Sequence, residues 1–75
     1  MKAYINSEAT VKDFHEGMNV KYVPTHVDGD ISHPDCEEGI VSWVNNQTVF
    51  VKYFRHGILQ STSQGTDPKD LIVLT

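Results

Sequence analysis

The residues best suited to chemistry lie together in one stretch, HVDGDISHPDCEEG, at positions 26–39. The stretch holds two of the four histidines, the only cysteine and five of the ten acidic residues of a 75-residue chain. Imidazole nitrogen and thiolate sulfur are zinc ligands, so His26, His33 and Cys36 could supply three of the four ligands of a tetrahedral site. Structural zinc sites usually present two ligand pairs, and here the second pair is missing. The alternative is a polar loop in which Cys36 packs inward as a small apolar residue.

Calcium is excluded by spacing. Asp28 and Asp30 look like the first ligands of an EF-hand loop, which needs glycine at its sixth position and glutamate at its twelfth. Counted from Asp28, these positions hold His33 and Gly39. The stretch therefore lacks both the sharp turn and the bidentate ligand of such a loop.

Nucleophilic catalysis by Cys36 is disfavoured by its surroundings. A catalytic cysteine needs its thiolate form and a neighbouring base that a third group orients. His33 is near in sequence, but the surrounding carboxylates oppose a thiolate by like-charge repulsion, and no oxyanion donor is evident. We expect no enzymatic activity.

The net charge of −4 is concentrated around this stretch, since residues 16–39 carry one base and six acids. Nucleic-acid binders usually show a basic footprint, which is absent here. A KOW-like nucleic-acid binder would need a basic stripe on one face, built from Lys21, Lys52, Arg55 and Lys69. Nucleic acid therefore remains the minor alternative.

Composition indicates one soluble domain. The chain is 39% hydrophobic and 21% charged, and no apolar run approaches the length of a membrane span. The N-terminus lacks the apolar stretch of a signal peptide, and a lone cysteine suits a reducing compartment. We expect a cytoplasmic protein with no membrane contact.

The pattern of apolar residues predicts strands at 19–24, 39–44, 48–54, 58–64 and 72–74. A short edge strand at 2–5 and a brief helix within 7–17 precede them, with Thr10 and Asp13 as a capping pair and Gly17 as the stop. Asn45 and Asn46 predict a tight hairpin turn with positive φ, and a second turn follows at residues 56–57. Asp67-Pro68 predicts a single helical turn before the last strand.

This element order, with a one-turn helix before the last strand, resembles the SH3-like barrel group, which includes SH3, Tudor and KOW-type domains. The resemblance implies a five-stranded all-β barrel over residues 17–75, with residues 1–16 packed on it as a strand and short helix. Residues 26–39 then occupy the loop after the first barrel strand, the place of the RT loop in SH3 domains. The ALYDY-like ligand motif of true SH3 domains is absent, so binding of proline-rich peptides does not carry over. The stretches HPDCEEGIVSWVNNQTVFVKYF and SQGTDPKDL are also similar to short uncharacterised phage and prophage proteins.

The strand at 48–54 is apolar on both faces. Alternation places Val49, Val51 and Tyr53 on one face and Phe50, Lys52 and Phe54 on the other. We expect Val11 and Phe14 to cover the second face; otherwise it binds another protein or a second copy of the chain as a homodimer.

The sequence thus predicts a non-enzymatic protein-interaction module. In this interpretation an acidic loop steers a basic partner, and Trp43, at the edge of that loop, supplies an apolar anchor. The binding residues would be Asp28, Asp30, Asp35, Glu37, Glu38 and Trp43. A zinc-binding module remains the other alternative.

Overall fold

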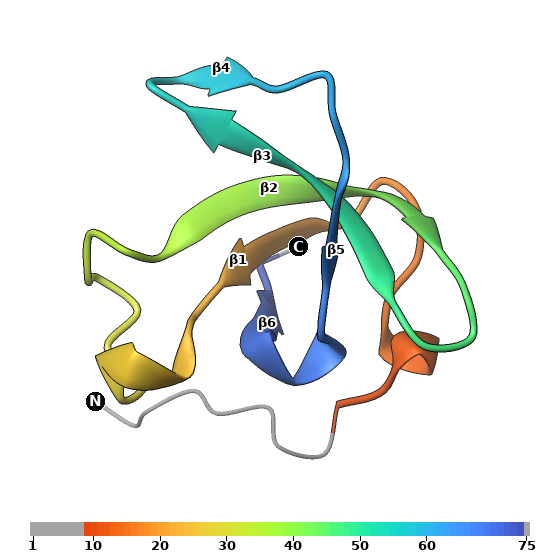
Figure 1. Cartoon of the computed structure of the whole chain (residues 1–75), viewed down its shortest axis with the longest axis horizontal. Coiled ribbons are helices and arrows are strands. Elements are labelled where there is room, and N and C mark those ends of the chain that lie inside the picture. The colour runs from red at the N-terminus through yellow and green to blue at the C-terminus, as the bar shows by residue number, and fades with distance from the viewer. Residues whose placement is uncertain (1–8, 75) are drawn as a thin grey trace.

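A computed structural model describes residues 9–74, which form a small all-β domain of antiparallel strands and single 3₁₀ turns (Figure 1). That range contains no α-helix, and no helix in it is long and apolar enough to cross a membrane. The strands are β1 (Asn19–Tyr22), β2 (Glu37–Val44), β3 (Val49–Arg55), β4 (Ile58–Leu59), β5 (Gln64–Thr66) and β6 (Leu71–Val73). The 3₁₀ helices are η1 (Val11–Asp13), η2 (Thr25–Val27) and η3 (Pro68–Asp70). The strand predicted at residues 2–5 lies outside the described residues.

The strands pair in the order β4-β3-β2-β1-β6, and β5 also pairs with β3. β3 therefore has β2 along one edge, with β5 and β4 following each other along the opposite edge. The sheet thus has six strands, not the predicted five, and no pairing among residues 9–74 closes it into a barrel.

The extra strand arises because the polar strand predicted at 58–64 is broken. Ile58 and Leu59 pair with the end of β3, whereas Gln64 to Thr66 pair with its start. Between them the chain bends at residues 61–62. The hydrogen bonds of the β3–β4 hairpin extend as far as the amide of Gln60, which donates to the carbonyl of Tyr53 at 2.9 Å. The β3–β4 hairpin stands away from the rest of the sheet as a result (Figure 1).

Both predicted capping sites are confirmed. The Thr10 side chain accepts from the amide of Lys12, and Asp13 Oδ2 accepts from the amide of Thr10 at 2.9 Å. At η3, Asp67 Oδ1 accepts from the amide of Lys69 at 2.9 Å. Each cap satisfies backbone donors that a helix start leaves free.

The two predicted hairpin turns differ in outcome. His56 and Gly57 both adopt positive φ, 53° and 76°, which gives the tight β3–β4 turn. The β2–β3 hairpin forms at Asn45 and Asn46 as predicted, but neither asparagine adopts positive φ, so that part of the prediction is wrong. Instead Asn45 Oδ1 accepts from the amides of Gln47 and Thr48 at 2.8 and 2.7 Å, and the side chain organises a longer turn.

The main core lies under the inner face of the sheet. Val49, Val51 and Tyr53 are 0%, 0% and 4% exposed, which confirms the predicted alternation of β3. Gly39 is buried against them. Only glycine fits there, because a Cβ would lie 2.7 Å from the Lys52 carbonyl oxygen. The cluster comprises Phe14, Val20, Val41, Val49, Val51, Tyr53 and Leu71.

Phe14 belongs to this inner cluster, and Val11 packs against the same cluster. The prediction that these two residues cover the face of Phe50 is therefore wrong. The predicted helix is only the three-residue turn η1, and the extended backbone of Phe14 directly after it ends the helix and sends the ring into the core.

A second, smaller core lies beneath the long loop between β1 and β2. Val23, Val27 and Ile72 are buried together, and Ile31 and Cys36 pack against them. Because Leu71 joins the main core while Ile72 joins the second, β6 is apolar on both faces. The stretch that looked chemically reactive thus folds over apolar residues of its own.

Candidate interaction surface

The loop between β1 and β2 is held by its own polar side chains. His26 Nε2 and Asp35 Oδ2 lie 2.6 Å apart, which closes the loop across nine residues. Asp30 Oδ1 accepts from both the amide and the hydroxyl of Ser32, at 3.0 and 2.6 Å. The hydrogen bond from His26 lowers the pKa of Asp35, and the bonds from Ser32 lower that of Asp30.

The three predicted zinc ligands are used in other ways. The rings of His26 and His33 meet edge to face with centroids 5.9 Å apart, and His33 Nδ1 accepts from the amide of Asp35 at 3.0 Å. The Cys36 thiol donates to the Asp30 carbonyl at 3.4 Å, and its burial raises the pKa of the thiol. Across residues 9–74, no three His, Cys, Asp or Glu side chains gather in a way that could hold a metal ion. The packing of Cys36 against the second core agrees with the simpler alternative of a polar loop.

The acids at the start of β2 already have basic neighbours. Glu37 Oε1 lies 3.6 Å from Arg55 Nε, and Glu38 Oε2 lies 3.9 Å from Lys21 Nζ. Asp28 has positive φ, 55°, at the end of η2 and lines a small cavity. Two of the five predicted acidic binding residues, Glu37 and Glu38, thus have their charge partly balanced by neighbouring bases.

Trp43 does not lie at the edge of this loop. The loop enters β2 at Glu37, whereas Trp43 is near the other end of β2, six residues or about 20 Å further along the strand. Trp43 pairs with Phe50 of β3 beside the β2–β3 turn. The acidic residues and Trp43 therefore belong to separate surfaces.

Trp43 reaches the outer face of the sheet through a β-bulge. The register between β2 and β3 shifts between Val41 and Trp43, so one extra residue stands in β2. Regular alternation would place Trp43 on the inner face with Val41, but the bulge places it opposite Phe50. Ser42, at the bulge, donates its hydroxyl to the Phe50 carbonyl at 3.1 Å. No local signal in the sequence predicts this shift.

The rings of Trp43 and Phe50 stack with centroids 5.2 Å apart and planes 27° apart. Trp43 nevertheless remains 58% exposed. Along β3 the same face continues to Phe54, which pairs with Leu59 of β4, and both are exposed. We call this surface the outer face; it comprises Ile40, Trp43, Phe50, Lys52, Phe54 and Leu59.

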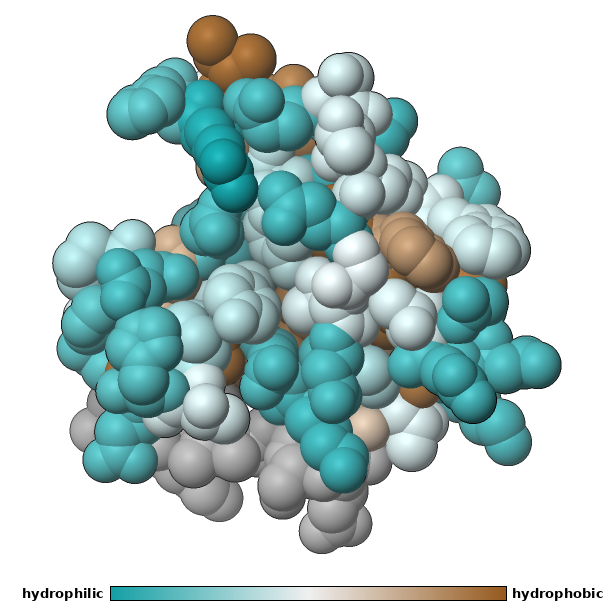
Figure 2. All heavy atoms as spheres, in the orientation of Figure 1, coloured by the Kyte–Doolittle hydropathy of each residue, from teal (hydrophilic) through white to brown (hydrophobic). Residues whose placement is uncertain are grey.

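The outer face borders an open hollow between the loop and the β3–β4 hairpin. Its volume is about 460 Å³, and Lys21, Cys36, Glu38, Phe54, Arg55 and His56 line it. Figure 2 shows the surface hollowed beside the projecting hairpin, which carries exposed hydrophobic residues at its end. Ile58 there is 67% exposed. The outer face thus continues into a recess with charged walls.

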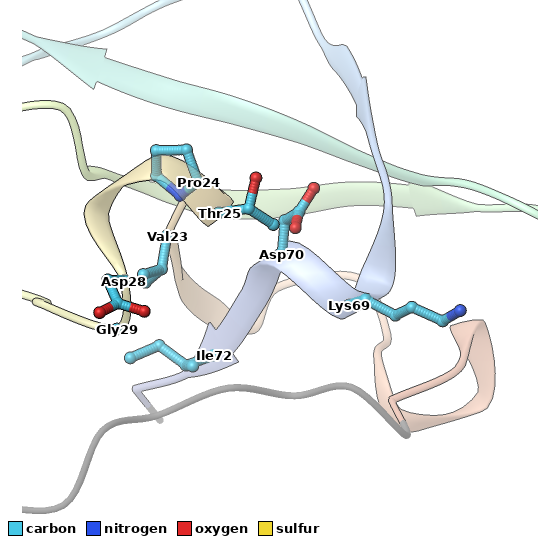
Figure 3. A pocket seen from close by; sticks show the side chains of 8 residues that line it. All are labelled: Val23, Pro24, Thr25, Asp28, Gly29, Lys69, Asp70 and Ile72. Carbon is cyan, nitrogen blue, oxygen red and sulfur yellow. The ribbon is translucent and has the colours of Figure 1, made fainter.

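A separate cavity of about 220 Å³ lies between η2 and η3 (Figure 3). Val23, Pro24 and Ile72 supply its apolar wall, and Lys69 extends away from it in Figure 3. The amide of Val23 donates to the Asp70 carbonyl at 2.7 Å, which joins the two segments beside the cavity. This hydrogen bond and the largely apolar wall indicate that the cavity accompanies the packing of the loop against η3.

The four basic residues that a nucleic-acid stripe would need are divided. Lys21 and Arg55 are paired with Glu38 and Glu37. Lys69 lies in η3 beside the cavity of Figure 3, and its side chain extends away from that cavity. Lys52 lies on the outer face, which borders the hollow lined by Lys21 and Arg55, so Lys69 lies apart from the other three bases and two of those three are paired with acids.

Comparison with protein-family models, with curated proteins and with solved structures finds no match to this chain.

Proposed function

We propose that this protein is a non-enzymatic protein-interaction module that contacts its partner through the outer face. The observation that carries this proposal is the Trp43–Phe50 stack, in which Trp43 stays 58% exposed on an uncovered part of the sheet. Solvent-facing sheet surfaces are usually polar, and exposed tryptophan is enriched where proteins bind one another. A stacked ring is also held in place, so little side-chain entropy is lost on binding.

The partner is a protein segment that combines apolar side chains with a carboxylate. Lys52 stands between Phe50 and Phe54 on the outer face, and no ion pair engages its ammonium group in residues 9–74. His56 lies at the adjoining end of the recess. A carboxylate of the partner would meet Lys52 while apolar side chains cover the rings on either side of it.

The strand arrangement supports a relationship to the SH3-like group of small barrels. β6, β1, β2 and β3 are consecutive neighbours, β4 and β5 together continue the sheet beyond β3, and the 3₁₀ turn η3 directly precedes β6. In this proposal β4 and β5 are two halves of one barrel strand interrupted by the bend at residues 61–62. One fold serves many functions, so the proposed function rests on the residues of the outer face and not on the strand order.

A peptide-display selection against the full chain tests the proposal. We expect enriched peptides to contain aromatic or aliphatic residues next to Asp or Glu. Because Trp43 is the only tryptophan, its fluorescence should shift to shorter wavelength when such a peptide covers it. Trp43→Ala and Lys52→Glu should each weaken the affinity about five- to thirtyfold, the usual effect of losing a contact residue worth 1–2 kcal/mol. Titration calorimetry measures these affinities, because Trp43→Ala contains no tryptophan.

The matched control reverses charges in the loop, which is the competing contact surface. A variant with Asp28→Lys and Asp30→Lys should keep the affinity for the selected peptides, because neither residue lines the recess beside the outer face. Binding that survives Trp43→Ala but is lost in the loop variant would move the contact to the acidic loop and overturn the proposal. A Trp43 emission that shifts with protein concentration alone would instead make the outer face a homodimer contact.

A further inference from the structure

A second cavity opens on the side of the sheet opposite the outer face. Its volume is about 240 Å³, and it lies where the ends of β1, β3 and β5 meet η3. Two tyrosine rings, one buried hydroxyl and three carboxylates line it, from Tyr22, Tyr53, Thr66, Glu37, Asp67 and Asp70. No lysine, arginine or histidine is among its lining residues.

The aromatic part of the cavity is rigid. The rings of Tyr22 and Tyr53 meet edge to face, with centroids 6.2 Å apart. Tyr53 is 4% exposed, and its hydroxyl lies 2.7 Å from Thr66 Oγ1, so β3 and β5 are tied together at the cavity. Fixed tyrosine faces attract cations through their negative quadrupole.

The charges around the cavity are poorly compensated. Asp67 Oδ1 is used in capping η3, and Glu37 has Arg55 3.6 Å away, but no ion pair engages the Asp70 carboxylate within residues 9–74. Burial and the charge of Asp67 raise the pKa of Asp70. Burial, together with the charges of Asp70 and Glu37, also raises the pKa of Tyr22. A cation bound at this position would stabilise the charged form of each group and so lower both pKa values.

We propose that this cavity binds an organic cation of the alkylammonium or guanidinium class. The rings of Tyr22 and Tyr53 would contact the cation, and the carboxylates of Asp70 and Glu37 would balance its charge. A space of about 240 Å³ is smaller than the usual pocket for a drug-sized ligand, and it suits the end of one side chain or a small amine. The rings of Tyr22 and Tyr53 are separate from the outer face, because inner and outer side chains of a strand point in opposite directions.

The test is a titration of the isotopically labelled full chain followed by amide chemical shifts. The probes are tetramethylammonium chloride and guanidinium chloride, with sodium chloride and calcium chloride at equal ionic strength as controls. We expect saturable shifts for the amides of Tyr22, Gly65 and Thr66 with the organic cations. The same titration is made with peptides that contain lysine, trimethyllysine or arginine. If a peptide binds more tightly than the free cation, the ligand is a protein side chain. If the two bind equally, the ligand is a small amine.

The variants separate the aromatic contribution from the carboxylate contribution. Tyr22→Leu and Asp70→Asn should each weaken binding roughly tenfold, since each removes a contact of the cation. Tyr22→Phe keeps the aromatic face and should bind as the unmodified chain does, as should Glu16→Gln, which removes an exposed acid outside the cavity. Asp70→Asn should fold normally because the charged form of Asp70 is disfavoured there.

The proposal is overturned if the organic cations cause no saturable shift at the cavity. It is also overturned if calcium or sodium produces the same shifts, or if the folded Tyr22→Leu variant binds unchanged. None of these results would affect the outer-face proposal, whose readout is the fluorescence of Trp43.

Discussion

Trp43 and Phe50 face each other across β2 and β3 with ring centroids 5.2 Å apart, and the β-bulge that brings them together lies at Ser42. The stack forms on the outer face, away from the main core, so the core does not require Trp43. Substituting Trp43 should therefore weaken the proposed binding without unfolding the domain.

Trp43→Ala should therefore lower the free energy of unfolding only modestly, by about 1 kcal/mol, the size of one aromatic pair. Phe50→Ala should cost more, because Phe50 is less exposed than Trp43. Chemical denaturation followed by far-ultraviolet circular dichroism measures both. A loss of cooperative unfolding in Trp43→Ala would mean that the stack belongs to the core.

Gly39→Ala should destabilise the protein strongly, by about 3 kcal/mol, as expected for overpacking. The added Cβ would lie 2.6 Å from Val51 Cγ1 and 2.7 Å from the Lys52 carbonyl oxygen, and backbone cannot move aside without breaking the β2–β3 pairing. Gly65→Ala is the matched control: its Cβ would meet the Thr48 methyl at 3.0 Å, and a side chain can yield. Thermal melts should rank Gly39→Ala well below Gly65→Ala, and equal melting temperatures would contradict this account of Gly39.

Chelation should leave the melting temperature unchanged. Cys36 packs against the second core and donates to the Asp30 carbonyl, so Cys36→Ala should cost about 1 kcal/mol through lost apolar contact alone. His33→Ala should show no added loss in the presence of chelator. Thermal melts with and without chelator, together with elemental analysis, make this measurement, and one zinc ion per chain would restore the metal hypothesis.

Tyr53 should make the fold sensitive to alkaline pH. Burial raises the pKa of Tyr53 to about 12 from an ordinary value of 10.0. Because the folded-state pKa is the higher one, the stability is fully present below pH 10.0 and is lost as the pH rises toward about 12. The tyrosinate absorbance of the folded chain should include one late-titrating group, which Tyr53→Phe removes at a cost of about 1 kcal/mol for the lost hydrogen bond to Thr66. If Tyr22→Phe removes the late-titrating group and Tyr53→Phe does not, the group is Tyr22 and this prediction is wrong.

Interactions within a few residues were predictable from the sequence. The Thr10–Asp13 cap, the Asp67-Pro68 turn and the turn at His56-Gly57 depend on side chains and backbone that are neighbours along the chain. The inward set of β3 was predictable for a similar reason, because alternation is a property of any extended strand.

Other features depend on contacts between distant segments, and only the tertiary structure decided them. The bulge that turns Trp43 outward exists only in the pairing of β2 with β3. The strand predicted at 58–64 is broken because its first half pairs with the end of β3 and its second half pairs with the start of β3. Phe14 went to the inner face, and the loop of Cys36 closed over Val23 and Ile72, which no local pattern indicates.

The cavity shows the same division. The sequence contains its tyrosines and acids at wide intervals, and none of them forms a motif. Tyr22, Tyr53 and Asp70 come from β1, β3 and η3, and these elements meet only because the strand order places them there. The sequence by itself determined which residues turn, cap and alternate, since these are local energies, whereas the tertiary structure decided which side chains share a surface, since that depends on the pairing of distant strands.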